Sequence, residues 1–363
     1  MDSDAASSEQ LPPGQSAPPN SRRKSKLRGL ISSHRLSFPF WSERRGSDLT
    51  PQNDKGPLGL TTFHQPAQET AGTDIVFVHG LGGDSVKTWR ISSNPESCWP
   101  KSWLPLEPGF ERVRIHSFGF DADWRKRTGV ALNIHGFAQS LLGELRNYPD
   151  IRQCNNPIMI VAHSMGGCIA KKMYILAKQD PACVDLASRI RCIFFLATPH
   201  RGSDLAGILC RILRVSGAPK PYINDLDSKS AALLELNDMF RHHAEDLRLW
   251  SFFETQPMSS FFEVPVVDKT SATLGYRNEE VSPMDANHRT VCKFHDRQDH
   301  NYRKVRNALA NALELLQAEE GEHTVLITTY DISMMTIHRA DLYPSAKNTD
   351  AGGLSRGQRF LRG

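Results

Sequence analysis

A serine with small residues on both sides stands near the middle of the sequence. Residues 157–177 read PIMIVAHSMGGCIAKKMYILA, so an apolar run ends just before Ser164 and a helical pattern begins just after it. A sharp strand-to-helix turn raises such a hydroxyl above a sheet, and its crowded backbone requires small neighbours. Three small residues meet that requirement: Ala162, Gly166 and Gly167. The pattern predicts a nucleophilic Ser164; the alternative is a serine that caps a helix before a glycine-rich packing contact.

A second signal is the His-Gly dipeptide in FVHGLGG, residues 77–83. At the end of a core strand, this dipeptide would place the backbone amide of Leu81 near the same serine. With the amide of Met165 it would form an oxyanion hole, which stabilises the charge of a tetrahedral intermediate. We interpret His79 as a structural residue. A plain glycine turn is the alternative, whereas a phosphate-binding P-loop is disfavoured because no Gly-Lys-Ser/Thr follows.

A serine nucleophile needs a base and an acid that orients the base. In an open parallel sheet with this turn, the order along the chain is serine, acid, histidine. Two acids end predicted strands, Glu254 and Asp268, and Glu254 is favoured because it ends the second core strand after that of Ser164. Further candidate acids are Glu280 and Asp285. The candidate bases are His288, His295 and His300, whereas His200 comes too early in the chain.

Alternating strand and helix patterns predict the elements that must position these residues. Apolar runs typical of strands buried on both faces of a parallel sheet are residues 74–80, 111–120, 157–162, 191–199, 247–254 and 264–268. Helical patterns cover residues 131–148, 166–178, 203–215, 228–246 and 301–317. The alternation predicts one doubly wound, mostly parallel α/β domain over residues 58–318.

Composition excludes several classes of function. The net charge of +4 belongs to residues 1–45, which hold eight Lys and Arg against four acids, so the body is neutral and nucleic-acid binding is disfavoured. The seven cysteines are scattered without a Cys-x-x-Cys pair, which argues against a structural metal site. We expect a disordered Ser/Pro/Arg-rich leader over residues 1–57, with a targeting or membrane-surface segment as the alternative. A poorly structured tail is expected over residues 319–363.

Five segments together resemble a known family: DIVFVHGLGGDSVKTW, VAHSMGGCIAKK, IFFLATPHRGSDLA, FFET and DANHRTVCKF. They are similar to α/β-hydrolase serine esterases of the serine-active-site-containing protein and GPI inositol-deacylase group, including fungal hydrolase-domain relatives. The resemblance covers about residues 58–315. It implies the α/β-hydrolase fold, with Ser164 as nucleophile, His288 as base and Glu254 as acid.

The resemblance also implies ester hydrolysis on lipid-like substrates at mitochondrial or endoplasmic-reticulum membranes, with the cytosol as the alternative location. We therefore expect a cofactor-free serine esterase whose partner is a lipid or a small ester, and which associates peripherally with a membrane. The competing hypothesis is a binding or signalling module that keeps the fold but turns over substrate weakly.

Overall fold

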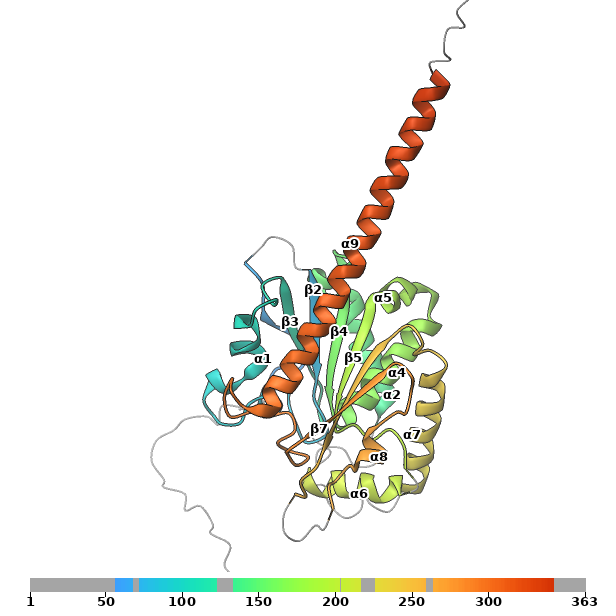
Figure 1. Ribbon diagram of the computed structural model, residues 1–363. Helices are drawn as coiled ribbons and strands as arrows, with labels where there is room; N and C mark the ends of the chain where they lie inside the picture. Colours follow the sequence, from blue (N-terminus) through green and yellow to red (C-terminus); the bar gives the residue numbers. More distant parts are fainter. Residues whose placement is uncertain are drawn as a thin grey trace, which may run out of the picture. The chain divides into compact units, whose positions relative to one another are not determined.

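A sheet of parallel strands with one antiparallel edge forms the centre of the molecule in the computed structural model (Figure 1), which describes residues 56–67, 72–122, 133–202, 204–216, 226–258 and 264–342. The strands are β1 (Gly59–His64), β2 (Thr73–Val78), β3 (Val113–Gly119), β4 (Ile158–His163), β5 (Ile190–Leu196), β6 (Arg248–Glu254) and β7 (Glu279–Met284). Their order is β1-β3-β2-β4-β5-β6-β7, and β1 alone among these described strands is antiparallel to its neighbour. This is the α/β-hydrolase fold, as the sequence predicts.

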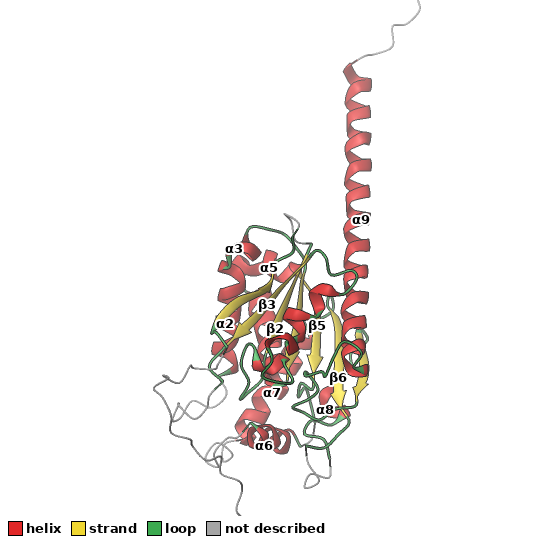
Figure 2. Ribbon diagram, turned by 90° about the vertical axis from the view of Figure 1, so that its left-hand side faces the viewer, coloured by secondary structure: helices red, strands yellow, loops and turns green. Residues whose placement is uncertain are grey.

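Helices cover both faces of the sheet (Figure 2), and the central strands β2, β4 and β5 supply side chains to the apolar cores on both faces. The described helices are α1 (Trp99–Ser102), α2 (Ile134–Asn147), α3 (Pro149–Arg152), α4 (Met165–Gln179), α5 (Val184–Arg189), α6 (Leu205–Val215), α7 (Leu226–Arg241), α8 (Lys269–Ala272) and α9 (His300–Leu342). In β2, Val76 and Val78 pack with α2, α4, α6 and α7, whereas Ile75 and Phe77 pack with α1 and α9. Burial on both faces explains why the core strands are apolar without alternation.

Two strands, β1 and β7, are absent from the predicted set, and one predicted strand is wrong. Residues 264–268 form a loop, in which Val266 and Val267 are buried and Asp268 caps α8. The sixth strand of the parallel set is instead β7, whose sequence EEVSPM is half exposed at the edge of the sheet. A short apolar run does not distinguish a buried loop from a strand, and an edge strand needs no apolar run.

The last helix is longer than expected. Helix α9 continues to Leu342, whereas we expected a poorly structured tail from residue 319. Between residues 318 and 342 the chain contains one glycine, Gly321, and no proline before Pro344, so little in the sequence stops a helix that has begun. The predicted leader, residues 1–57, lies almost entirely outside the described residues, as do residues 343–363. No described helix is both long and apolar enough to cross a membrane.

A buried lysine lies between α4, α7 and the loop after β5. Lys171 is fully buried, and its Nζ lies 3.0 Å from His200 Nδ1 and 3.3 Å from Asn237 Oδ1. Both partners are uncharged acceptors, since burial and the charge of Lys171 hold the pKa of His200 well below 6.5. Burial likewise lowers the pKa of Lys171 to about 8, although Cys168 and Glu279 raise it slightly. A buried cation without a carboxylate in direct contact costs free energy.

Because Lys171 is buried, we predict that the stability of the folded protein changes with pH in the alkaline range. The pKa is about 8 in the folded protein against an ordinary 10.5, so the unfolded state binds more protons between these values. The contribution of Lys171 to the free energy of unfolding therefore rises between pH 8 and 10.5, by up to about 3 kcal/mol. This contribution is lost again as the pH falls through 8. Urea unfolding of wild type and Lys171→Met across this range measures it, and parallel curves would contradict the prediction.

Candidate active site

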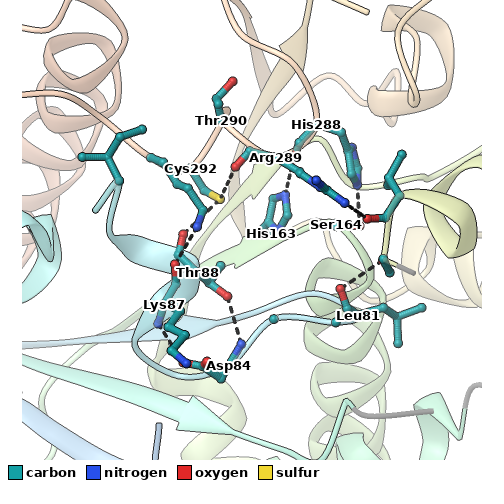
Figure 3. Close-up of a pocket in the computed structure, with 16 residues that line it drawn as sticks. Leu81, Asp84, Lys87, Thr88, His163, Ser164, His288, Arg289, Thr290 and Cys292 are labelled. Carbon is teal, nitrogen blue, oxygen red and sulfur yellow. Dashed lines mark hydrogen bonds between the residues drawn. The ribbon is translucent and has the colours of Figure 1, made fainter. Parts of the chain in front are cut away.

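Ser164, Glu254 and His288 come together at the carboxyl ends of the strands, where α/β sheets place their ligands. Figure 3 shows the first of these contacts, between His288 and Ser164. Ser164 follows β4, Glu254 is the last residue of β6, and His288 lies in the loop after β7. The Nε2 atom of His288 is 2.9 Å from Ser164 Oγ, and its Nδ1 atom is 3.1 Å from Glu254 Oε1. All three side chains are buried. The sequence-predicted nucleophile, base and acid therefore lie in one hydrogen-bonded chain.

The contacts of His288 determine which nitrogen carries the proton. A carboxylate oxygen accepts, so Nδ1–H of His288 donates to Glu254 and Nε2 keeps a lone pair directed at Ser164. A histidine in this tautomer can remove the hydroxyl proton of Ser164 as the oxygen attacks a carbonyl carbon. Glu254 Oε1 also accepts the backbone amide of Val267, at 2.5 Å.

The backbone of Ser164 is in a conformation that residues with a side chain rarely adopt. Its φ is 53° and its ψ is −126°, and its hydroxyl makes no capping bond to α4. The turn is tight enough that a Cβ atom at Gly166 would lie 2.5 Å from the carbonyl oxygens of Val78 and His79. The alternative of an ordinary helix cap is therefore not what the structure shows: the hydroxyl faces His288, on the tight and strained strand-to-helix turn that the sequence predicts.

The His-Gly loop packs directly against this turn. A Cβ atom at Gly80 would lie 2.9 Å from the Cβ atom of Ser164, so glycine permits the close approach. His79 donates from Nδ1 to the carbonyl of Gly80 and accepts the amide of Phe120 at Nε2. Burial lowers the pKa of His79 to about 4, so it stays neutral and fixes the loop.

The two predicted oxyanion donors lie beside Ser164. Leu81 lines the cavity that Ser164 also lines. Met165 is the first residue of α4, and the first amides of a helix have no acceptor within it. That the backbone amides of Leu81 and Met165 donate hydrogen bonds to a substrate oxygen stays a prediction.

His163 is a residue of this site that the sequence analysis does not select. Its Nε2 is 2.9 Å from the backbone oxygen of His288; since that oxygen only accepts, Nε2–H of His163 donates. Burial and the nearby His288 lower the pKa of His163 to about 3, so it remains neutral. The side chain thus ties the nucleophile strand to the loop that carries the base. Its position directly before Ser164 is the sequence signal that could have found it.

The other sequence candidates lie elsewhere. Asp268 accepts from the backbone amide and the hydroxyl of Ser271 and so caps the start of α8. Asp285 accepts from Gln256, and Glu280 is exposed on β7. His295 and His300 are exposed and do not line the cavity at Ser164.

The cavity beside Ser164 has a volume of about 460 Å³ and a basic lining. Three cationic side chains line it, Lys87, Arg289 and Lys293, against one acid, Asp84. Arg289 donates to the carbonyl of Val215 at the end of α6, and Lys293 Nζ donates to the carbonyl of Lys87 at 2.7 Å. Apolar side chains complete the wall: Leu81, Ile91 and Val215. The lining suits a ligand with both an apolar and an anionic part.

Comparison with known proteins gives the same relatives as the sequence motifs. Residues 69–208 match the PGAP1-like alpha/beta domain. Protein SERAC1 of Bos taurus is 33% identical over 289 residues, which are 72% of this chain and 43% of that protein. Protein SERAC1 of Homo sapiens is 32% identical over 266 residues, 66% of this chain and 40% of that protein. The resemblance stated from the sequence is confirmed, and the chain spans about two fifths of the length of these relatives.

Solved structures similar to this chain include lipase-like proteins. Lipase BlEst2 of Bacillus licheniformis, in its mature form, aligns with a TM-score of 0.47 at 17% identity, over 66% of this chain and 94% of that one. A lipase-esterase related protein of Clostridium acetobutylicum aligns with a TM-score of 0.44 at 14% identity, over 70% of this chain and 98% of that one.

The hydrogen bond from His163 to the carbonyl of His288 predicts that two substitutions of His163 lower the turnover of a chromogenic ester to different extents. His163→Leu removes the donor, and the loss of one such bond should lower kcat by about tenfold. His163→Gln keeps an amide donor at similar reach and should retain most of the rate. Because His163 stays neutral down to about pH 3, the Gln variant and wild type should share one pH profile above pH 5. Equal losses in both variants would show that the bond is unimportant.

Proposed function

We propose that this protein is a serine hydrolase that cleaves carboxylic esters without a cofactor. The observation that carries the proposal is the buried chain Ser164–His288–Glu254, on a strained turn and in a tautomer suited to base catalysis. Residues 58–318 would form the hydrolase domain. The competing hypothesis, a weakly active binding module, gives no reason for a strained serine backbone aligned with a histidine and a buried carboxylate.

The reaction would run in two steps through an acyl-enzyme. Ser164 Oγ attacks the ester carbon while His288 Nε2 takes its proton, and the carbonyl oxygen becomes an anion beside the amides of Leu81 and Met165. The intermediate then expels the alcohol, which receives the proton from His288. A water then attacks the acyl carbon while His288 takes its proton. The bond from the acyl carbon to Ser164 Oγ breaks, Ser164 regains its proton from His288, and the carboxylic acid leaves.

The lining of the cavity favours a lipid-like ester substrate that carries a negative charge. Its apolar wall can take part of an acyl or alkyl chain, and Lys87, Arg289 and Lys293 give it a positive potential. The family resemblance implies lipid-like substrates, and we propose peripheral association with mitochondrial or endoplasmic-reticulum membranes; the cytosol is the alternative location.

The central test replaces each proposed catalytic residue in a purified esterase assay. Ser164→Ala should lower kcat for p-nitrophenyl butyrate by about 10⁴-fold or more with little change in unfolding temperature. Glu254→Gln should lose up to about 10⁴-fold, because the neutral amide does not stabilise the charged imidazolium and its NH2 group can turn to His288 and favour the wrong tautomer. Asp268→Asn is the matched control and should stay within about tenfold of wild type. Retained turnover in Ser164→Ala would refute the mechanism, and the reverse order of the two acid variants would move the acid role to Asp268.

The basic lining predicts a preference among esters. Lys293→Gln keeps a donor for the carbonyl of Lys87 and removes one charge from the cavity. It should lower kcat/KM about threefold to tenfold for a p-nitrophenyl ester whose acyl chain ends in a carboxylate. The neutral ester of equal length should be unaffected, and added salt should shrink the difference. An equal change for both esters would count against an anionic substrate.

A further inference from the structure

The motif ATPHRGSD, residues 197–204, follows β5 and has no part in the proposed reaction. Its His200 is fully buried, accepts the bond from Lys171 at Nδ1, and has no partner for Nε2 among the described residues. Two weaker contacts join the same loop to α4: Cys168 Sγ lies 3.5 Å from the carbonyl of Pro199, and the side chain of Thr198 lies against Gly167. The bond from Lys171 to His200 is therefore the strongest polar link between this loop and the helix that begins at Ser164.

The loop in turn holds α8. The backbone amide of His200 donates to the carbonyl of Ser271 at 2.8 Å, and Arg201 Nε donates to the carbonyl of Thr270 at 3.3 Å. Helix α8 has only four residues, so it is too short to be stable by itself and depends on such contacts.

The start of α8 controls the position of Glu254. Val267, two residues before the helix, donates its amide to Glu254 Oε1, the same oxygen that accepts from His288. The second carboxylate oxygen, Oε2, has no hydrogen-bond partner among the described residues. A carboxylate held by one backbone amide can rotate when that amide moves, and the orientation of His288 would change with it.

We propose that Lys171 and His200 are positioning residues for the acid of the triad: their buried bond fixes the loop after β5, which fixes α8 and the Val267 amide that holds Glu254. This inference rests on the proposed function. It explains why a cation is buried at a cost to stability at a distance from the reacting atoms. The same network predicts that the pair acts on turnover through Glu254 and has little effect on substrate binding.

The test compares His200→Leu with His200→Asn, whose Oδ1 can accept from Lys171 where Nδ1 does. His200→Leu should lower kcat for p-nitrophenyl butyrate by about tenfold to 100-fold, with KM within about twofold of wild type. His200→Asn should keep most of the wild-type kcat. Lys172→Met, at the neighbouring position on α4, is the control and should match wild type. The double variant Lys171→Met/His200→Leu removes both polar partners, so it should fold even if His200→Leu does not, and it should show the same loss of kcat.

The deciding measurement repeats His200→Leu in a Glu254→Ala background, in which no side-chain oxygen can accept from Val267 or His288. If the pair acts through the acid, the second substitution should cost less than about twofold, because the contact it supports is already gone. An equal loss in both backgrounds would reduce the pair to general structural support and overturn the proposal. If Ser164→Ala retains full turnover, the proposed function fails instead, and if Glu254→Gln alone has no effect, the acid assignment fails.

Discussion

The close approach of α4 to the end of β2 is the constraint on which the site depends. With no side chain at Gly166, the first turn of α4 lies against the carbonyl oxygens of Val78 and His79, and the chain can reverse at Ser164. The serine backbone takes a left-handed φ as a consequence. This strain costs about 1–3 kcal/mol, and the packing of β4 and α4 on both sides holds it. The result is a hydroxyl that faces His288 instead of capping the helix.

Three histidines, of which His79 and His200 are fully buried and His163 is partly buried, then fix the loops around that hydroxyl. His79 bonds within the loop that carries Leu81, His163 bonds to the loop that carries His288, and the backbone amide of His200 bonds to α8. Burial lowers the pKa of each, so each stays neutral near pH 7 and serves as a hydrogen-bonding group. A neutral His163 also adds no positive charge beside His288, so a proton taken from Ser164 can stay on His288. Neutral hydrogen-bonding groups thus hold these loops, while Lys87, Arg289 and Lys293 line the cavity.

Much of the fold follows from the sequence because the core strands are apolar on both faces and alternate with helical patterns. Ser164 and Glu254 could be selected because the serine turn needs small neighbours and Glu254 ends a core strand. The residues left His288, His295 and His300 open as bases, and the family resemblance singled out His288. The loop containing Val266 and Val267 was mistaken for a strand because burial alone does not fix the backbone, and the half-exposed β7 gave no apolar signal. The roles of His163 and Lys171 depend on contacts across 125 and 29 residues of sequence, which no local pattern reveals.

Covalent labelling can show whether Ser164 is a nucleophile activated by His288. A fluorophosphonate reacts with activated serines, and the labelled peptide can be identified by mass spectrometry. We predict one adduct, on Ser164, formed at least about 100-fold more slowly in His288→Gln. An adduct at another residue, or an unchanged rate in His288→Gln, would contradict it.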